Sequence, residues 1–175
     1  MQQFTHPTNP LGYFSSAECG RIALAKTFPE LALIALDVLG RMPGDVGFVC
    51  GPITTGGLGS FEKNLARFAR TIDLLAARGY NVFTQVIFQE ALLRLYSDKS
   101  YCKGDIHLLE EFYTPVFSSD RVTTQCFIPG SESSHGATWE KNLGQSLGLA
   151  QLHFHDNYES RQVYESLFQE QLKHP

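Results

Sequence analysis

A short unbroken apolar run at residues 46–50 constrains the fold of this chain more than any other stretch. Such a run, without polar alternation, is typical of a strand buried on both faces of a parallel sheet. It leads into a Gly/Thr-rich loop at 51–60, followed by an amphipathic helical pattern that ends at Gly79. A second strand pattern follows at 80–86. Strand, helix and strand in this order predict a βαβ unit and therefore a parallel sheet.

The rest of the chain extends the same alternation. Strand patterns recur at 122–128 and 150–155. Helical patterns are found at 16–40, 89–96, 106–117, from about 137 onward, and at 158–173. The sequence therefore predicts a doubly wound α/β fold, flavodoxin-like or Rossmann-like, with a sheet of four or five parallel strands, flanking helices and an extra N-terminal helical segment.

We expect one structural unit, because 175 residues with 43% apolar and 18% charged residues are enough to bury a core. Residues 1–44 are predicted to form an N-terminal arm and helical extension, and 45–175 the α/β domain. Pro29 is expected to break the first helical pattern. The piece after it, 31–39, is apolar nearly all round, so core packing and a subunit interface are equal alternatives for it.

Charge and cysteine content exclude several classes of function. The net charge of −4 predicts no basic patch, so no nucleic acid polymer is expected as a partner. The apolar segments are too interrupted by charged residues and proline to span a membrane. The cysteines are widely spaced, which favours reduced thiols in a cytoplasmic protein over a zinc site or a disulfide scaffold. His153 and His155 point the same way along a strand, but without an evident third ligand we expect no metal.

Two loops follow predicted strands and should meet at the same edge of the sheet. The first is the Gly/Thr-rich loop, whose backbone amides at a helix N-terminus suit an anion, although a merely structural turn is an equal alternative and the lysine of a P-loop is missing. Its candidate binding residues are Gly51, Pro52, Ile53, Thr54 and Thr55. The second loop, at 129–136, supplies hydrogen-bond donors before the next helix through Ser134, His135 and Gly136.

Glu140 is the most informative residue. It shares a helix face with Ala137, Leu143 and Leu147, and that face should pack on the sheet. One interpretation is an acid in the first helical turn, where the helix dipole favours it. The other is a carboxylate pointing into the cleft between the two loops, as nucleophile or general base.

The order of these motifs resembles the nucleoside 2-deoxyribosyltransferase-like superfamily over about residues 46–155. The matching stretches are 50–54 (CGPIT), 78–83 (RGYNVF) and 134–140 (SHGATWE). The resemblance implies cleavage of the N-glycosidic bond of a deoxynucleoside or nucleotide, with no cofactor. Glu140 would attack the anomeric carbon and form a glycosyl-enzyme ester, which water or a second base resolves.

The resemblance also refines the expected substrate. Ser134, six residues before the glutamate, is similar to the serine of the 2'-deoxynucleoside 5'-phosphate N-hydrolase branch, which implies a nucleoside 5'-monophosphate. Glu110 or Glu111 would be the second carboxylate, and both could equally be solvated charges. An aromatic hydroxyl of the first loop has no counterpart here, because Ile53 and Leu58 occupy that region.

Two further readings remain open. One is a non-catalytic nucleotide-binding module of the same fold, and the other is an assembly protein that works through its N-terminal helices. Relatives in the superfamily usually form dimers, so a homo-oligomer is expected.

Overall fold

The computed structural model describes residues 12–54 and 56–158. It contains a four-stranded, all-parallel sheet in the order β2-β1-β3-β4. The strands are β1 (Val46–Cys50), β2 (Val82–Phe83), β3 (Val122–Phe127) and β4 (Ala150–His153). The predicted parallel α/β fold is confirmed. Most of the expected terminal helix at 158–173, most of the N-terminal arm and Thr55 lie outside the described residues.

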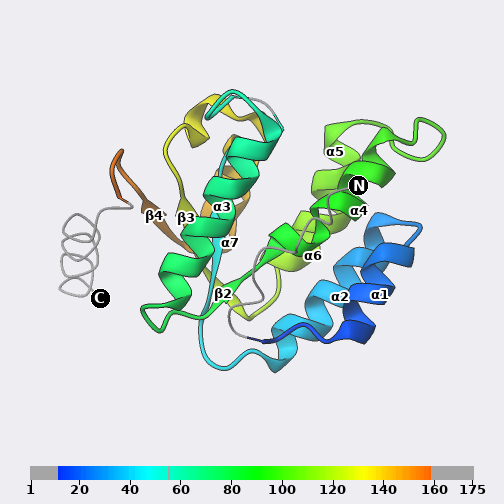
Figure 1. Ribbon diagram of the computed structural model, residues 1–175, viewed down its shortest axis with the longest axis horizontal. Coiled ribbons are helices and arrows are strands. Elements are labelled where there is room, and N and C mark those ends of the chain that lie inside the picture. The colour runs from blue at the N-terminus through cyan, green and yellow to red at the C-terminus, as the bar shows by residue number, and fades with distance from the viewer. Residues whose placement is uncertain (1–11, 55, 159–175) are drawn as a thin grey trace.

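Side chains of β1 alternate between two cores, one on each face of the sheet. Val49 belongs to the core under α3 (Phe61–Ala76), together with Phe68, Ile72 and Leu75 of that helix. Figure 1 shows α3 crossing the sheet on the viewer's side. The helix begins at Phe61 because Ser60 caps it by accepting a hydrogen bond from the Lys63 N–H at 3.3 Å.

The opposite face carries the larger, aromatic core. Phe48 of β1 lies there between Phe83 and Phe117, with ring centroids 5.7 and 4.7 Å away. The helices of this side are α2 (Phe28–Arg41), α4 (Gln89–Ser97), α6 (Thr114–Phe117) and α7 (His135–Leu147). Because helices cover both faces, both sides of β1 are buried, as its unbroken apolar run requires.

The N-terminal helices α1 (Ser16–Leu24) and α2 form a hairpin against this aromatic core (Figure 1). The helical structure is interrupted at residues 25–27, before Pro29, because Thr27 caps α2. The proline lies in the first turn of α2, where its missing N–H leaves no helical hydrogen bond unmade. Most of the apolar surface of α2 is core. Leu33 remains exposed on α2, as does Leu24 at the end of α1.

One predicted strand is shorter in the structure, and one predicted helix has a π-helical turn in its interior. The second strand is only two residues long, and residues 85–88 turn into a 3₁₀ helix. Helical structure over Asp105–Phe117 passes through Pro115 without ending. A π-helix, η2 (Leu109–Tyr113), precedes the proline. In a regular α-helix the Pro115 ring would clash with the backbone carbonyl four residues earlier, and the wider π-helical turn leaves room for it.

A buried amide fixes α7 on the sheet. Gln125 of β3 is fully buried and donates from Nε2 to the Glu140 carbonyl oxygen at 2.8 Å. Its Oε1 accepts from Gln151 Nε2 of β4 at 2.9 Å. Gly144, one turn further along α7, lies so close to this amide that a Cβ there would overlap it. Helix, β3 and β4 are therefore joined by one satisfied polar network.

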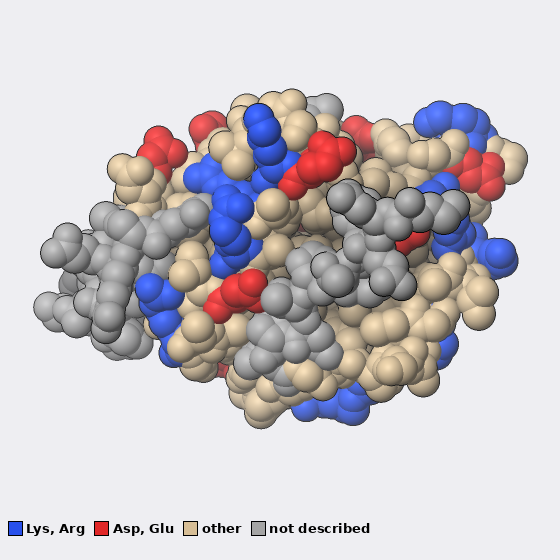
Figure 2. Space-filling model, viewed as in Figure 1, with Lys and Arg blue, Asp and Glu red and all other residues tan. Residues whose placement is uncertain are grey.

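The described helices include none that is both long and apolar enough to cross a bilayer. Figure 2 shows Lys and Arg side chains gathered over α3, with acidic side chains on the same face of the molecule. This mixed surface carries no large field of one sign.

We predict that Gly144→Ala destabilises the fold by about 1–3 kcal/mol, because the added methyl group displaces Gln125 or lifts α7. The matched control is Gly20→Ala in α1, where a Cβ meets no atom within 4 Å. That substitution should be neutral or stabilising by up to about 1 kcal/mol. Urea unfolding of both variants measures the difference, and equal free energies of unfolding would contradict the tight contact.

Candidate functional site

The two predicted loops meet at the carboxyl edge of the sheet, above β1 and β3. The first loop is organised by the buried side chain of Asn64 on α3. Asn64 Oδ1 accepts from the Leu58 N–H at 2.8 Å, and Nδ2 donates to the carbonyls of Ile53 and Gly56 at 3.1 and 3.2 Å. These bonds fix the loop in one conformation. The sequence pattern did not predict this role, because nothing in it distinguishes Asn64 from the other polar residues of the helix.

Glycines allow the loops to touch. Gly57 has φ +59°, and a Cβ there would lie 2.6 Å from Asn64 Oδ1 and 2.7 Å from Pro52 Cγ. Gly130 has φ +87°, and a Cβ there would lie 3.5 Å from the Gly57 Cα. Both positions therefore favour glycine for their backbone conformation, and Gly57 requires it for space as well. Within the first loop, Pro52 is buried, Gly51 and Ile53 are half-buried, and Thr54 is exposed.

The second loop leads into α7. Its Ser131–Ser133 segment forms the 3₁₀ helix η3, and the Ser134 hydroxyl then caps α7 by accepting from the Ala137 N–H at 3.3 Å. Ser134 is buried, whereas His135 is exposed, with Nδ1 3.7 Å from Asp105 Oδ2. Gly136 is half-buried in the first turn. The N-terminus of α7 thus lies at the sheet edge, as predicted.

Glu140 lies in the second turn of α7. The prediction of a first-turn position is wrong, because the cap at Ser134 starts the helix at His135. Interaction with the helix dipole therefore does not explain this acid. The Glu140 side chain faces inward, and the residue is 7% exposed.

Burial raises the pKa of Glu140 to about 8, while hydrogen bonding with the adjacent Cys50 thiol lowers it. The same proximity acts on Cys50: burial, and next the charge of Glu140, raise the pKa of its thiol. Near neutral pH the Glu140 carboxyl therefore favours its protonated form, because its buried environment disfavours the charged form. A carboxyl of this kind is typical of functional sites.

A cluster of buried polar side chains surrounds this carboxyl. Burial raises the pKa of the Tyr113 hydroxyl, and the charge of Glu140 adds to the effect. Gln89 lies beside Tyr113, and Gln85 donates from Nε2 to the Val49 carbonyl of β1. We call the set the Glu140 cluster; it consists of Cys50, Gln89, Tyr113 and Glu140.

The Glu140 cluster has unmet hydrogen-bonding capacity. Within the described part of the chain, Gln89 Nε2 of the cluster is buried without a partner at hydrogen-bonding distance, as are Thr84 Oγ1 and Gln85 Oε1 just after β2. Each such atom costs about 1–3 kcal/mol when nothing satisfies it. A ligand or ordered water in contact with these atoms would remove that cost.

The predicted second carboxylates are not members of the Glu140 cluster. Glu110 is exposed on the π-helix. Glu111 contacts His107, with its Oε2 2.9 Å from Nε2, and accepts from the Tyr101 hydroxyl at 3.2 Å. Tyr113 is instead the titratable residue of this segment that lies next to Glu140. Nothing in the sequence pattern distinguished it from a core aromatic residue.

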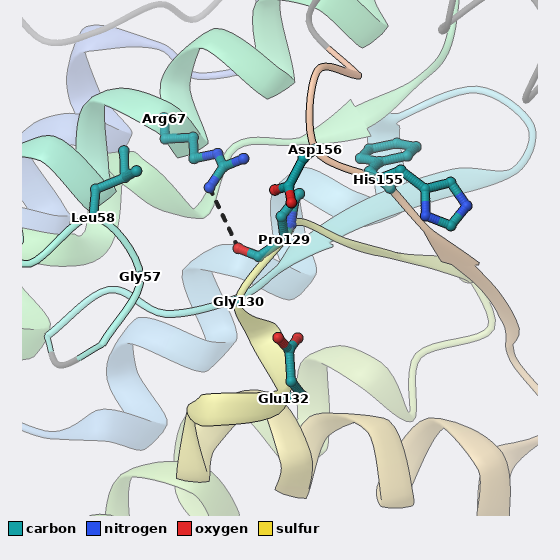
Figure 3. Close-up of a pocket in the computed structure, with 9 residues that line it drawn as sticks. Gly57, Leu58, Arg67, Pro129, Gly130, Glu132, His155 and Asp156 are labelled. Atoms are coloured by element: carbon teal, nitrogen blue, oxygen red, sulfur yellow. Dashed lines mark hydrogen bonds between the residues drawn. The ribbon is translucent and has the colours of Figure 1, made fainter.

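A pocket of about 430 Å³ opens on the other side of the second loop, toward α3. Figure 3 shows its walls: the first loop, the second loop, Arg67 of α3 and the segment after β4. The lining residues are Gly57, Leu58, Arg67, Pro129, Gly130, Glu132, Phe154, His155 and Asp156. Glu140 is not among them, so the pocket and the Glu140 cluster are separate features of one sheet edge.

Among the residues that the structure describes, no group of three or more His, Cys, Asp or Glu side chains is arranged to hold a metal ion. His153 stacks on Phe127, with ring centroids 4.9 Å apart, as expected for a histidine packed at the sheet edge. Comparison with models of known families, with curated proteins and with solved structures finds no match to this chain.

The raised pKa of Glu140 predicts a pH-dependent stability. The folded chain retains a proton up to pH of about 8, whereas the unfolded chain releases it near the ordinary value of 4.5. The free energy of unfolding should therefore fall as pH rises between these two values and then level off.

Glu140→Gln should remove this dependence. The variant should match the native chain at about pH 4 and exceed its stability at about pH 9 by an amount on the order of 1–4 kcal/mol. Glu90→Gln, an exposed acid on α4, is the control that should leave the slope unchanged. Urea unfolding across this pH range is the measurement, and parallel profiles for all three proteins would refute a buried, protonated Glu140.

Proposed function

We propose that this protein cleaves the N-glycosidic bond of a (deoxy)nucleoside 5'-monophosphate by retaining double displacement, as a hydrolase or a base-exchange transferase. The observation that carries the proposal is the Glu140 cluster. It combines an inward-facing carboxyl of raised pKa with a buried amide nitrogen that lacks a partner, at the carboxyl edge of a parallel sheet. Ligands of open α/β sheets bind at this edge.

In the proposed reaction, Glu140 first loses its proton. A carboxylate oxygen then forms a bond to C1' of the sugar as the bond from C1' to the base nitrogen breaks, and the leaving base takes up a proton. Water, or the nitrogen of a second base, attacks C1' and releases the carboxylate. A carboxylate with few water contacts stabilises the oxocarbenium-like transition state more strongly than a solvated one.

The N-terminus of α7 supports the choice of a 5'-phosphate. Ser134 uses an oxygen lone pair to accept from Ala137, and a hydroxyl in this arrangement still has its proton to donate. The helix is 13 residues long, so its dipole favours an anion at this end.

A second candidate is a nucleotide-binding module without catalysis, and a specific observation favours it. The two loops approach closely at Gly57 and Gly130, where a Cβ added to Gly130 would lie 3.5 Å from the Gly57 Cα, and the pocket at this edge lies on the far side of the second loop from Glu140. A nucleotide bound only by the first and second loops would then not contact the Glu140 carboxyl. Catalysis requires the two loops to separate around the sugar.

Deoxynucleoside and ribonucleoside 5'-monophosphates, each with its 5'-hydroxyl counterpart, form the test panel for base release by chromatography. We expect release from a monophosphate, and a loss of about a thousandfold or more in Glu140→Gln. Glu62→Gln, an exposed acid on α3, is the matched control and should retain full activity. Nucleotide binding without base release by the native chain would refute the enzyme and establish the module. Neither binding nor release would refute both.

The pH profile adds a signature specific to a buried nucleophile. Because Glu140 must be ionised to attack, kcat/KM should rise with pH up to about 8 and level off above it. Measurement of initial rates from about pH 5 to 10 checks this, with Glu62→Gln following the native curve. A profile that falls over the same range would assign Glu140 to acid catalysis instead of nucleophilic attack.

A further inference from the structure

We propose that the outer face of the α1–α2 hairpin binds the same face of a second copy of this chain, about a two-fold axis. Leu24 of α1 is 73% exposed and Leu33 of α2 is 60% exposed, the two highest values among the large apolar side chains of the described residues. Figure 1 shows the hairpin at the end of the molecule opposite β4. This proposal does not depend on the glycosidase proposal, because no residue of this face belongs to the Glu140 cluster.

The two leucines lie at the same end of the hairpin. Two ion pairs join the helices, one between Glu18 and Arg41 and the other between Arg21 and Asp37. An early residue of α1 thus contacts the end of α2, so the helices run antiparallel. The leucines are near the end at which residues 25–27 connect the helices, and they form the raised part of the face.

The opposite end of the face carries small residues. Ala17 and Gly20 share a side of α1 with Leu24, at steps of three and four residues, and Gly40 lies two turns after Leu33 on α2. All three small residues are exposed, and a Cβ at either glycine would meet no atom within 4 Å. This end of the face is therefore low.

A face with one raised and one low end fits a copy of itself. A two-fold axis between the ends places the leucines of each copy over the small residues of the other, so that both sets pack closely. A flat apolar partner would contact only the raised end. The shape of the hairpin therefore favours a second copy in antiparallel orientation.

The charges in the middle of the face are complementary under the same axis. Arg21 Nη1 lies 3.3 Å from Asp37 Oδ2, and the two side chains are each 54% exposed. Rotation about the axis places Arg21 opposite the partner's Asp37 and Asp37 opposite the partner's Arg21. The four charges then alternate in sign, which fixes the register of the two copies. An entirely apolar partner would instead remove this ion pair from water without compensation.

Sedimentation velocity of the full chain over a range of concentrations tests the proposal. We expect a monomer–dimer equilibrium with a dissociation constant on the order of 10 µM, as for a small interface. Leu33→Glu should raise that constant at least about a hundredfold, because a two-fold interface contains every substitution twice. Ile106→Glu is the matched control. Ile106 is 50% exposed on α5 (Asp105–Leu108), outside the hairpin, and its substitution should leave the dimer unchanged.

A pair of charge variants tests the two-fold geometry itself. Arg21→Asp gives each copy two acids at the centre of the face, and Asp37→Arg gives each copy two bases, so each variant alone should be monomeric. Mixed in equal amounts, they should form a heterodimer, because every acid then faces a base. An exposed ion pair contributes little to folding, and far-UV circular dichroism of each variant verifies that the fold is retained.

Three outcomes would overturn the proposal. The first is a native chain that stays monomeric up to about 200 µM, well above the expected dissociation constant. The second is equal weakening of the dimer by Leu33→Glu and Ile106→Glu. The third is a mixture of the two charge variants that associates no better than either alone. Base release by Glu140 is measured separately, so neither proposal fails with the other.

Discussion

The hydrogen bond from Gln125 to the Glu140 carbonyl sets the position of α7, and the candidate site depends on that position. Gln125 is fully buried, so its amide must find partners inside the protein. It finds them on α7 and on β4, through Gln151, which also donates to the Lys141 carbonyl at 2.8 Å. Gly144 lets the helix come close enough for these bonds. One polar contact thus fixes the rotation of α7 about its axis.

That rotation determines the chemistry of Glu140. With the helix backbone held against Gln125, the Glu140 side chain has to enter the space above Cys50 and beside Tyr113 instead of turning to solvent. An interior carboxyl favours its neutral form, and the unsatisfied Nε2 of Gln89 belongs to a side chain beside Tyr113. The fold therefore maintains a buried carboxyl and unsatisfied polar atoms at the carboxyl edge of the sheet, although both lower its stability. Buried polar groups that destabilise a fold in this way are found mainly at functional sites, where a bound ligand can compensate for them.

The sequence predicted the fold better than the site, for physical reasons. A parallel sheet is dictated by apolar runs such as Val46–Cys50, and the cap of α3 follows from the local chemistry of Ser60. The inward direction of Glu140 was predictable from its helix face. Its neighbours were not, because Gln89 and Tyr113 reach it from elements whose packing no local pattern specifies. The same holds for Asn64, whose partners lie up to 11 residues away along the chain.

The second loop separates two environments that differ in their exposure to solvent. On the α7 side, Glu140 is enclosed, and burial raises its pKa to about 8. On the α3 side, Glu132 and Asp156 are exposed and share their space with Arg67. A single loop, which approaches the first loop closely at Gly57 and Gly130, therefore keeps an enclosed carboxyl apart from exposed ones.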